Sequence, residues 1–320
     1  MPVKKPLAAS RLPWLLRMKK KSRFIAPLLT WLLLVSCTPA AGADVTKAPG
    51  LNLQTAWQSA AVFADPESVV FDPVSRILLV ASGNGPVMER AGNGYLSKVA
   101  LNGVVLDHTW LSGFHSPKGI ALAADTLYVA DISDLVVIDL TSGRRSTYPA
   151  SAATSLRDVA LDQQGRLYLS DTCSDTIYTF ADGVMEVWLH SPRLAGPGAL
   201  FVQDNSLYVG SRVRQSGGLE PKETGRLLAI DLHTKEIRAV GGGLPLVAVG
   251  GVAGLADRGF LITDRQQGRL LHLDVQGRVR ERIDVGSGAA GLHVLPEDWE
   301  LVVVPLARDN MLKAFHLPIR

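Results

Sequence analysis

The chain has 320 residues, of which 47% are hydrophobic and 20% charged, a composition that can bury a sizeable apolar core. Its formal net charge of +3 is unevenly distributed, because residues 1–36 carry eight Lys and Arg and no Asp or Glu. Without that segment, 25 of the 33 basic residues remain against 30 acidic residues, a net charge of −5. A body of this charge lacks the concentrated positive surface that nucleic-acid binding needs, so we expect no nucleic-acid partner.

The first 36 residues have the organisation of a signal peptide. Lys19–Lys21 and Arg23 form a basic region, and the apolar run Phe24–Ser36 is too short to span a bilayer comfortably. Met18 is a candidate for the true start, because a leader of ordinary length begins there. The tetrapeptide Leu34-Val35-Ser36-Cys37 resembles the lipobox of bacterial lipoproteins, which implies cleavage before Cys37 and lipidation of its thiol. The alternative is an ordinary signal peptide followed by an incidental cysteine.

A lipid on Cys37 would hold the chain on a membrane of the cell envelope. Thr38 follows this cysteine, and the resemblance to lipoproteins then implies the outer membrane, facing the periplasm, if the host is Gram-negative. Residues 37–50 are rich in small residues and proline, which predicts a flexible tether. Cys173 is the other cysteine of the sequence and would have no partner, so we expect no internal disulfide.

From residue 51 onward the sequence is repetitive. Each unit has a Pro- or Gly-rich corner, a short apolar run, a turn, and a second run that commonly ends in Asp or Ser. The six units open at Pro66, Pro117, Leu156, Pro197, Val252 and near Gly288. Their spacing of about 37 to 55 residues brackets the length of one four-stranded propeller blade. The sequence therefore predicts an all-β fold, a six-bladed β-propeller over residues 51–320.

The strands within a unit are clearest in the third. Runs rich in β-branched and aromatic residues occupy 157–161, 166–170, 176–180 and 184–189, and Asp or Gly marks the turns between them. The last unit supplies three strands before Arg320. We expect residues 55–63, near the start of the predicted domain, to supply the fourth strand and close the ring, which removes an exposed sheet edge.

Aligning the units gathers two rings of residues at one mouth of the central channel. The first ring, at the start of each inner strand, is Glu67, Lys118, Arg157, Gly198, Ala253 and Ala290. The second ring, at the end of each second strand, is Ser82, Asp131, Asp171, Ser211, Asp264 and Pro305. An insertion at residues 212–225 adds Arg212, Arg214 and Lys222 near the same mouth.

The blade pattern and strand ends such as Tyr128-Val129-Ala130-Asp131 resemble the senescence marker/gluconolactonase/luciferin-regenerating family of six-bladed propellers. Members that hydrolyse sugar lactones bind one divalent cation through a Glu, an Asn and an Asp, and a further Asn contacts the substrate. Glu67 stands at the Glu position and is the family ligand that this chain retains. The substrate Asn position is Arg157, followed by Asp158. The two other ligand positions fall on Gly198 and Ala253, which have no side-chain oxygen.

These departures change the expected chemistry of the mouth. Lys118 and Arg157 outnumber Glu67, and a site of positive charge attracts a carboxylate or phosphate and repels a metal ion. We therefore expect no cofactor, and a site for a small anionic ligand formed by Glu67, Lys118, Arg157, Asp158, Asp131, Asp171 and Arg212. Two simpler roles stay open: these charges could pair with one another, and Asp131, Asp171 and Asp264 could bond nearby backbone N–H groups in turns.

Three functions follow from this interpretation. The one we favour is an envelope-anchored, gluconolactonase-like propeller that binds a small anion or a partner protein of the envelope. The second is a lactone or ester hydrolase of the family, which would use Ca²⁺, Zn²⁺ or Mn²⁺. The third is an interaction scaffold for other envelope proteins.

Overall fold

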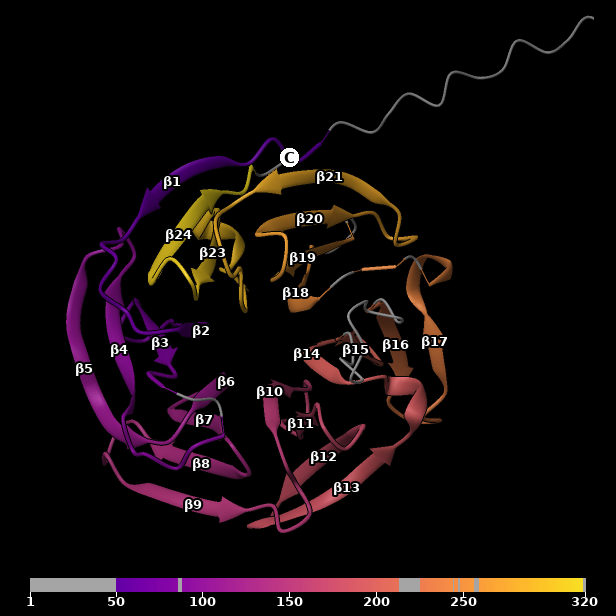
Figure 1. Ribbon diagram of the computed structural model, residues 1–320, viewed down its shortest axis with the longest axis horizontal. Coiled ribbons are helices and arrows are strands. Elements are labelled where there is room, and N and C mark those ends of the chain that lie inside the picture. The colour runs from indigo at the N-terminus through magenta and orange to yellow at the C-terminus, as the bar shows by residue number, and fades with distance from the viewer. Residues whose placement is uncertain are drawn as a thin grey trace, which may run out of the picture. The chain divides into compact units, whose positions relative to one another are not determined.

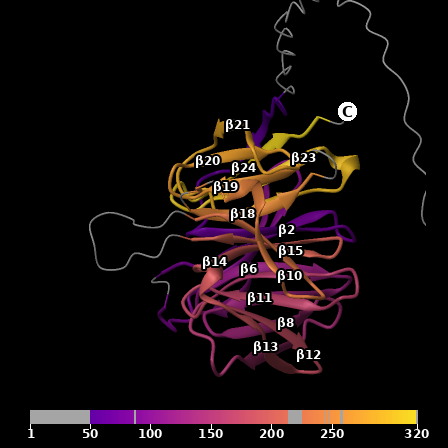
Figure 2. The same cartoon turned by 90° about the vertical axis from the view of Figure 1, so that its right-hand side faces the viewer.

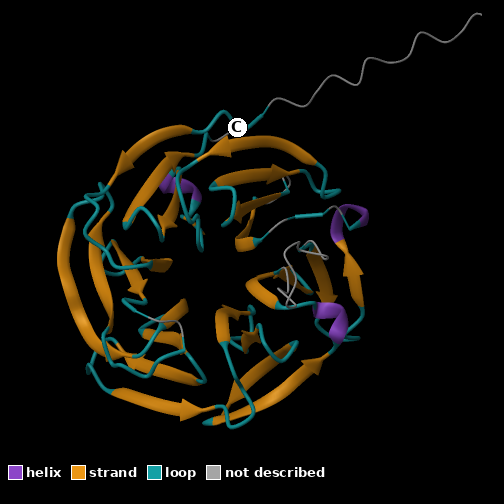
Figure 3. Ribbon diagram, in the orientation of Figure 1, coloured by secondary structure: helices purple, strands orange, loops and turns teal. Residues whose placement is uncertain are grey.

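The computed structural model describes residues 50–85, 88–212, 225–243, 245–246, 248–255 and 259–318. The predicted signal peptide, Cys37, the tether up to residue 49, and insertion residues 213–224 with Arg214 and Lys222 lie outside the described residues. The described residues form six four-stranded antiparallel sheets arranged in a ring (Figures 1 and 3). The predicted six-bladed β-propeller is confirmed.

The blades follow one another around the ring, and each is built from strands consecutive in sequence except the last. The first comprises β2 (Pro66–Asp72), β3 (Ile77–Ser82), β4 (Gly94–Ala100) and β5 (Val105–Phe114). The second comprises β6 (Pro117–Ala123), β7 (Thr126–Asp131), β8 (Asp134–Asp139) and β9 (Arg145–Pro149). The third comprises β10 (Leu156–Leu161), β11 (Leu167–Asp171), β12 (Thr176–Ala181) and β13 (Val184–His190).

The fourth blade comprises β14 (Pro197–Gln203), β15 (Ser206–Ser211), β16 (Leu227–Asp231) and β17 (Ile237–Ala239). The fifth comprises β18 (Val249–Gly254), β19 (Phe260–Asp264), β20 (Arg269–Leu273) and β21 (Val279–Asp284). The sixth comprises β22 (His293–Val294), β23 (Leu301–Leu306) and β24 (Met311–His316), with β1 (Gln54–Gln58) as its outer strand. Short 3₁₀ turns occur at Pro192–Leu194, Val240–Gly242 and Glu297–Trp299, and no helix among the described residues is long and apolar enough to cross a membrane.

The N-terminal strand closes the ring as predicted. β1 pairs antiparallel with β24, with Gln54 opposite His316 and Gln58 opposite Lys313. It ends at Gln58, earlier than the predicted residue 63. The reason is local: the Ser59 hydroxyl accepts the backbone N–H of Leu312 at 2.9 Å, so a side chain replaces a backbone carbonyl of the ladder.

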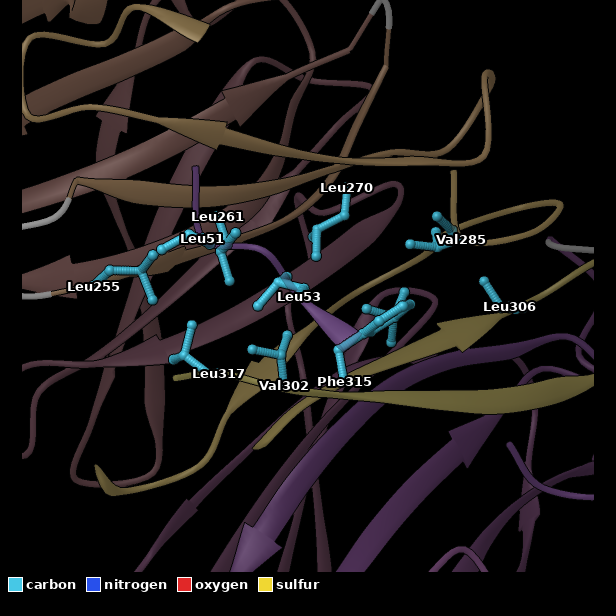
Figure 4. Close-up of a cluster of buried hydrophobic side chains, with 12 residues drawn as sticks. Leu51, Leu53, Leu255, Leu261, Leu270, Val285, Val302, Leu306, Phe315 and Leu317 are labelled. Atoms are coloured by element: carbon cyan, nitrogen blue, oxygen red, sulfur yellow. The ribbon is translucent and has the colours of Figure 1, made fainter. Parts of the chain in front are cut away.

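The apolar core lies between neighbouring blades, because each sheet packs its two faces against the sheets beside it. One cluster joins the fifth and sixth blades, and Figure 4 shows how Leu51 and Leu53, just before β1, insert into it. Both leucines are buried, as are Leu261 of β19 and Phe315 of β24, which they join. The segment from Leu51 to Gln58 thus contributes backbone hydrogen bonds to one blade and apolar contacts to two.

Seen from the side in Figure 2, the strands cross the thickness of the disk. The inner strands β2, β6, β10, β14 and β18 surround its axis (Figure 1). Each inner strand begins at the edge where its neighbour, the second strand of the blade, ends. This repeated antiparallel return collects residues from all six blades at one mouth of the central channel.

Candidate functional site

The register of the blades defines the residues at this mouth. The first residue of each inner strand, or its counterpart in the sixth blade, is paired with the end of the second strand: Pro66 with Ser82, Pro117 with Asp131, Leu156 with Asp171, Pro197 with Ser211, Val249 with Asp264, and Ala289 with Leu306. The next residue along the chain occupies the corner of its blade. The corner residues are therefore Glu67, Lys118, Arg157, Gly198, Gly250 and Ala290.

Two positions of the predicted rings were wrong. The fifth corner is Gly250 and not Ala253, and the second-ring residue of the sixth blade is Leu306 and not Pro305. The fifth inner strand starts with Val249-Gly250-Gly251 and lacks the proline that marks the corner of blades one, two and four. Since Gly250 also has no side-chain oxygen, the correction restores no metal ligand.

Glu67 is the centre of an ion-pair network. Its carboxylate is buried and accepts hydrogen bonds from Lys118 Nζ (2.7 Å) and Arg157 Nη2 (2.8 Å). Arg265 grips the same carboxylate with both ends of its guanidinium, from Nη1 to Oε2 (2.8 Å) and from Nη2 to Oε1 (2.9 Å). Although burial alone would raise the pKa of Glu67, Arg157, Lys118 and Arg265 together hold it well below its usual range. The pairing of Glu67 with Lys118 and Arg157, which the sequence left open, is present.

Arg265 is a site residue that the sequence analysis missed. It directly follows Asp264, the end of β19, and so occupies the same position in the fifth blade as Arg212 in the fourth. Both backbone N–H groups donate to the loop that precedes the inner strand of their own blade, Arg212 to Gly196 O and Arg265 to Ala248 O. Extending the repeat alignment by one residue beyond the second ring would have found Arg265.

Asp65, just before β2, adds a second carboxylate to the network. Its two oxygens lie 3.4 Å from Lys118 Nζ and from Arg265 Nη2, longer than the contacts of Glu67. Burial and the nearby charge of Glu67 raise the pKa of Asp65, against the opposing effect of Lys118 and Arg265. Asp65 is therefore the weaker acceptor of the two carboxylates.

Arg212 completes the group of cations. Its side chain packs over the corner glycine Gly198, where an added Cβ would lie 3.0 Å from Arg212 Cδ. Repulsion from Arg157, burial, and repulsion from Arg265 lower the pKa of Arg212 to about 9. Among the described residues no carboxylate forms an ion pair with Arg212. The mouth thus holds four cations, Lys118, Arg157, Arg212 and Arg265, against the carboxylates of Asp65 and Glu67, a formal charge of +2.

Asp131 and Asp171 accept hydrogen bonds from the backbone of their own corners. Asp131 accepts the backbone N–H groups of His115 and Ser116 at 2.6–3.1 Å. Asp171 accepts those of Thr154, Ser155 and Cys173 at 2.7–3.1 Å. Because these backbone N–H groups occupy both carboxylates, the predicted place of Asp131 and Asp171 in a ligand site is replaced by the turn-forming role that the sequence left open.

Asp158 faces the channel, and it forms no ion pair within the part of the chain that the structure describes. Its Oδ2 accepts the N–H of Leu200 on β14 at 2.8 Å, and its Oδ1 accepts that of Val159 at 2.9 Å. The inner strand of the second blade approaches from the other side, and a Cβ added to Gly119 would lie 2.3 Å from Asp158 Oδ1. Burial raises the pKa of Asp158 to about 6, more than the backbone hydrogen bonds and Arg157 lower it.

A central cavity of about 260 Å³ lies at the axis of the ring. The inner strands of all six blades line it, and Glu67, Lys118, Arg157, Asp158 and His293 are its titratable lining residues. His293, on β22, lies on the cavity wall. Burial lowers the pKa of His293 to about 4, so its ring is neutral at pH 7.

The mouth does not fit the divalent cation of the resembled family. An ionised carboxylate offers about four lone-pair sites, and those of Glu67 face four N–H groups of Lys118, Arg157 and Arg265. The other two ligand positions are Gly198 and Gly250. A hard cation needs several oxygen ligands, and within the described ranges no three His, Cys, Asp or Glu side chains gather in a group that could hold a metal.

Comparison with known proteins agrees with the fold. A putative gluconolactonase of known structure is 12% identical and superposes with a TM-score of 0.62, covering 84% of this chain and 98% of that one. Regucalcin, a calcium-binding protein from Agrobacterium tumefaciens, is 15% identical with a TM-score of 0.59, covering 82% and 93%. The chain has the gluconolactonase-like propeller fold.

This fold is shared more widely. Virginiamycin B lyase from Staphylococcus aureus, in a structure with quinupristin, is 13% identical with a TM-score of 0.55, covering 83% of this chain and 99% of that one. No protein-family model and no curated protein sequence matches the chain. At these identities the likeness establishes the gluconolactonase-like propeller fold, and the chemistry has to be argued from the mouth itself.

Proposed function

We propose that this gluconolactonase-like propeller binds a small anionic ligand at the charged mouth of its channel. The observation that carries the proposal is Arg212, a cation held beside Arg157 and Arg265 with no carboxylate partner among the described residues. Guanidinium groups crowded in this way repel one another, and a carboxylate or phosphate between them would relieve that repulsion and form charge-assisted hydrogen bonds. Each such bond contributes about 1.5–3 kcal/mol.

Glu67 has a positioning role in this proposal. By accepting from three cations it holds Lys118, Arg157 and Arg265 in place before the ligand arrives, so less side-chain entropy is lost on binding. The same interactions argue against hydrolysis with Ca²⁺, Zn²⁺ or Mn²⁺. They occupy the carboxylate oxygens of Glu67, the one metal ligand of the resembled family that this chain retains. The envelope location, the lipid on Cys37 and a partner protein in the envelope belong to the same proposal and rest on the N-terminal sequence.

The test is the thermal unfolding of the full-length chain in sodium propanoate or sodium phosphate, against sodium chloride at equal ionic strength. A ligand that binds the native state alone raises the melting temperature in a saturable way. We expect this rise in the native chain and its loss in Arg212→Gln. Arg238→Gln is the matched control, since it removes an exposed guanidinium from the same blade. No anion-specific rise, or an equal rise in Arg212→Gln, would refute the proposal.

A further inference from the structure

Asp158 is a buried carboxylate that no cation among the described residues neutralises. Among the described residues it forms no ion pair, although Arg157 precedes it, because the Arg157 guanidinium turns to Glu67. Within the described ranges, its hydrogen-bond donors are two backbone N–H groups, those of Leu200 and Val159, which leave about half of its lone-pair sites open. Buried carboxylates are normally paired, since transfer out of water costs several kcal/mol.

The side chain of Asp158 lies on the axis side of the ring. Asp158 sits on β10, yet its carboxylate contacts Leu200 of β14 on one side and approaches Gly119 of β6 on the other. A side chain on one inner strand that reaches both neighbouring inner strands, and that lines the central cavity, faces the channel. Gly119 leaves the space that this carboxylate occupies, because a side chain there would collide with it.

No other residue that lines the cavity neutralises the charge of Asp158. His293 is uncharged at neutral pH, and Lys118 and Arg157 are bound to Glu67. Asp158 is thus an acceptor one residue below the cationic mouth, in the same cavity. Consecutive residues of a strand are about 3.3 Å apart, so one small molecule can reach both levels.

We propose that Asp158 is a second recognition group of this site, and that the ligand is a small anion which also carries a hydrogen-bond donor, a hydroxyl or an ammonium group. This inference rests on the proposed function, since the anionic end binds at the cationic mouth while the donor reaches Asp158. The cavity volume of about 260 Å³ lies below the roughly 300–1,000 Å³ of sites for drug-sized ligands, which limits the ligand to a small molecule.

Three probes with the same three-carbon skeleton test the inference on the full-length chain at pH 7.5. Propanoate offers the anion alone, lactate adds a hydroxyl, and alanine adds an ammonium group. Calorimetric titration should give at least tenfold tighter binding of lactate or alanine than of propanoate, and the stronger of the two identifies the donor. Equal affinities for all three would overturn the role of Asp158 and leave the anion site standing. Binding of none would overturn the proposed function as well.

Two variants test whether Asp158 causes the preference for lactate or alanine over propanoate. Asp158→Asn should reduce the advantage of lactate or alanine over propanoate to less than about threefold while propanoate binding persists. Asp107→Asn is the matched control, since Asp107 is an exposed carboxylate on the outer strand β5. A preference unchanged in Asp158→Asn, or lost equally in Asp107→Asn, would contradict the inference. Because the probe series on the native chain needs no variant, the inference remains testable if Asp158→Asn does not fold.

Discussion

Replacing Glu67 with Gln removes the negative charge on which Lys118, Arg157 and Arg265 converge. The ammonium of Lys118 is the most affected, because its side chain is 4% exposed and its remaining acceptor, Asp65, lies 3.4 Å away. Removing one partner of a buried ion pair leaves an uncompensated charge and costs about 3–5 kcal/mol. We therefore expect Glu67→Gln to lower the free energy of unfolding by about that amount.

Urea denaturation of the full-length chain, followed by tryptophan fluorescence, measures this loss. Asp284→Asn is the control, since it breaks the exposed pair with Arg269, in which Asp284 is 84% exposed, and such pairs contribute about 0.2–1 kcal/mol. Adding Lys118→Met to Glu67→Gln should recover part of the loss by removing the unpaired ammonium. If the unfolding free energy of Glu67→Gln stayed within about 1 kcal/mol of that of the control, the ion-pair network would not stabilise the fold as much as we expect.

The loss should also depend on pH. The folded pKa of Glu67 is depressed, so its contribution is present above the ordinary glutamate pKa of 4.5 and is lost progressively as the pH falls below it. The stability difference between the native chain and Glu67→Gln should therefore narrow in acid. A difference that widened below pH 4.5 would contradict the direction of the pKa shift.

Three further predictions concern the pH response, the ring closure and the anchor. The pKa of Asp158 is raised from 3.8 to about 6, so ionisation destabilises the fold. The unfolding free energy of the native chain relative to Asp158→Asn should fall by about 2 kcal/mol from pH 4 to pH 7, and a flat difference would refute this. Deleting residues 51–63 should lower the melting temperature far more than deleting residues 38–50, because the former removes β1 with its buried leucines; equal melting temperatures would exclude the role given to β1. Cys37→Ala should move the protein from the membrane fraction to the soluble fraction, and an unmodified N-terminus at another cleavage site, seen by mass spectrometry, would rule out the lipid anchor.

The fold was predictable because its signals are local and repeated. Turn residues and short apolar runs recur in each unit, and the incomplete last unit indicated that an N-terminal strand closes the ring. The fifth blade was misaligned by three residues because β18 opens on Val249-Gly250-Gly251, where no proline marks the corner. The end of β1 was misplaced because the Ser59 hydroxyl takes over one hydrogen bond of the ladder, which periodicity does not reveal.

The site was predictable in part. Glu67, Lys118 and Arg157 were found because they occupy equivalent positions in consecutive units. Arg265 was missed because it lies 198 residues from Glu67 in sequence and one position beyond the aligned ring. The carboxylate with which each cation pairs depends on how far its side chain extends across the channel. A repeat alignment holds no information on that reach, so it left open the pairing that the structure resolves.

The most direct test of the central claim is a pair of calorimetric titrations of the full-length chain in detergent, one with sodium propanoate and one with calcium chloride. We expect saturable propanoate binding that is lost in Arg212→Gln and kept in Arg238→Gln, and no stoichiometric binding of Ca²⁺. Stoichiometric Ca²⁺ binding that disappears in Glu67→Gln, together with no binding of propanoate, would contradict the central claim and restore the metal-dependent hydrolase.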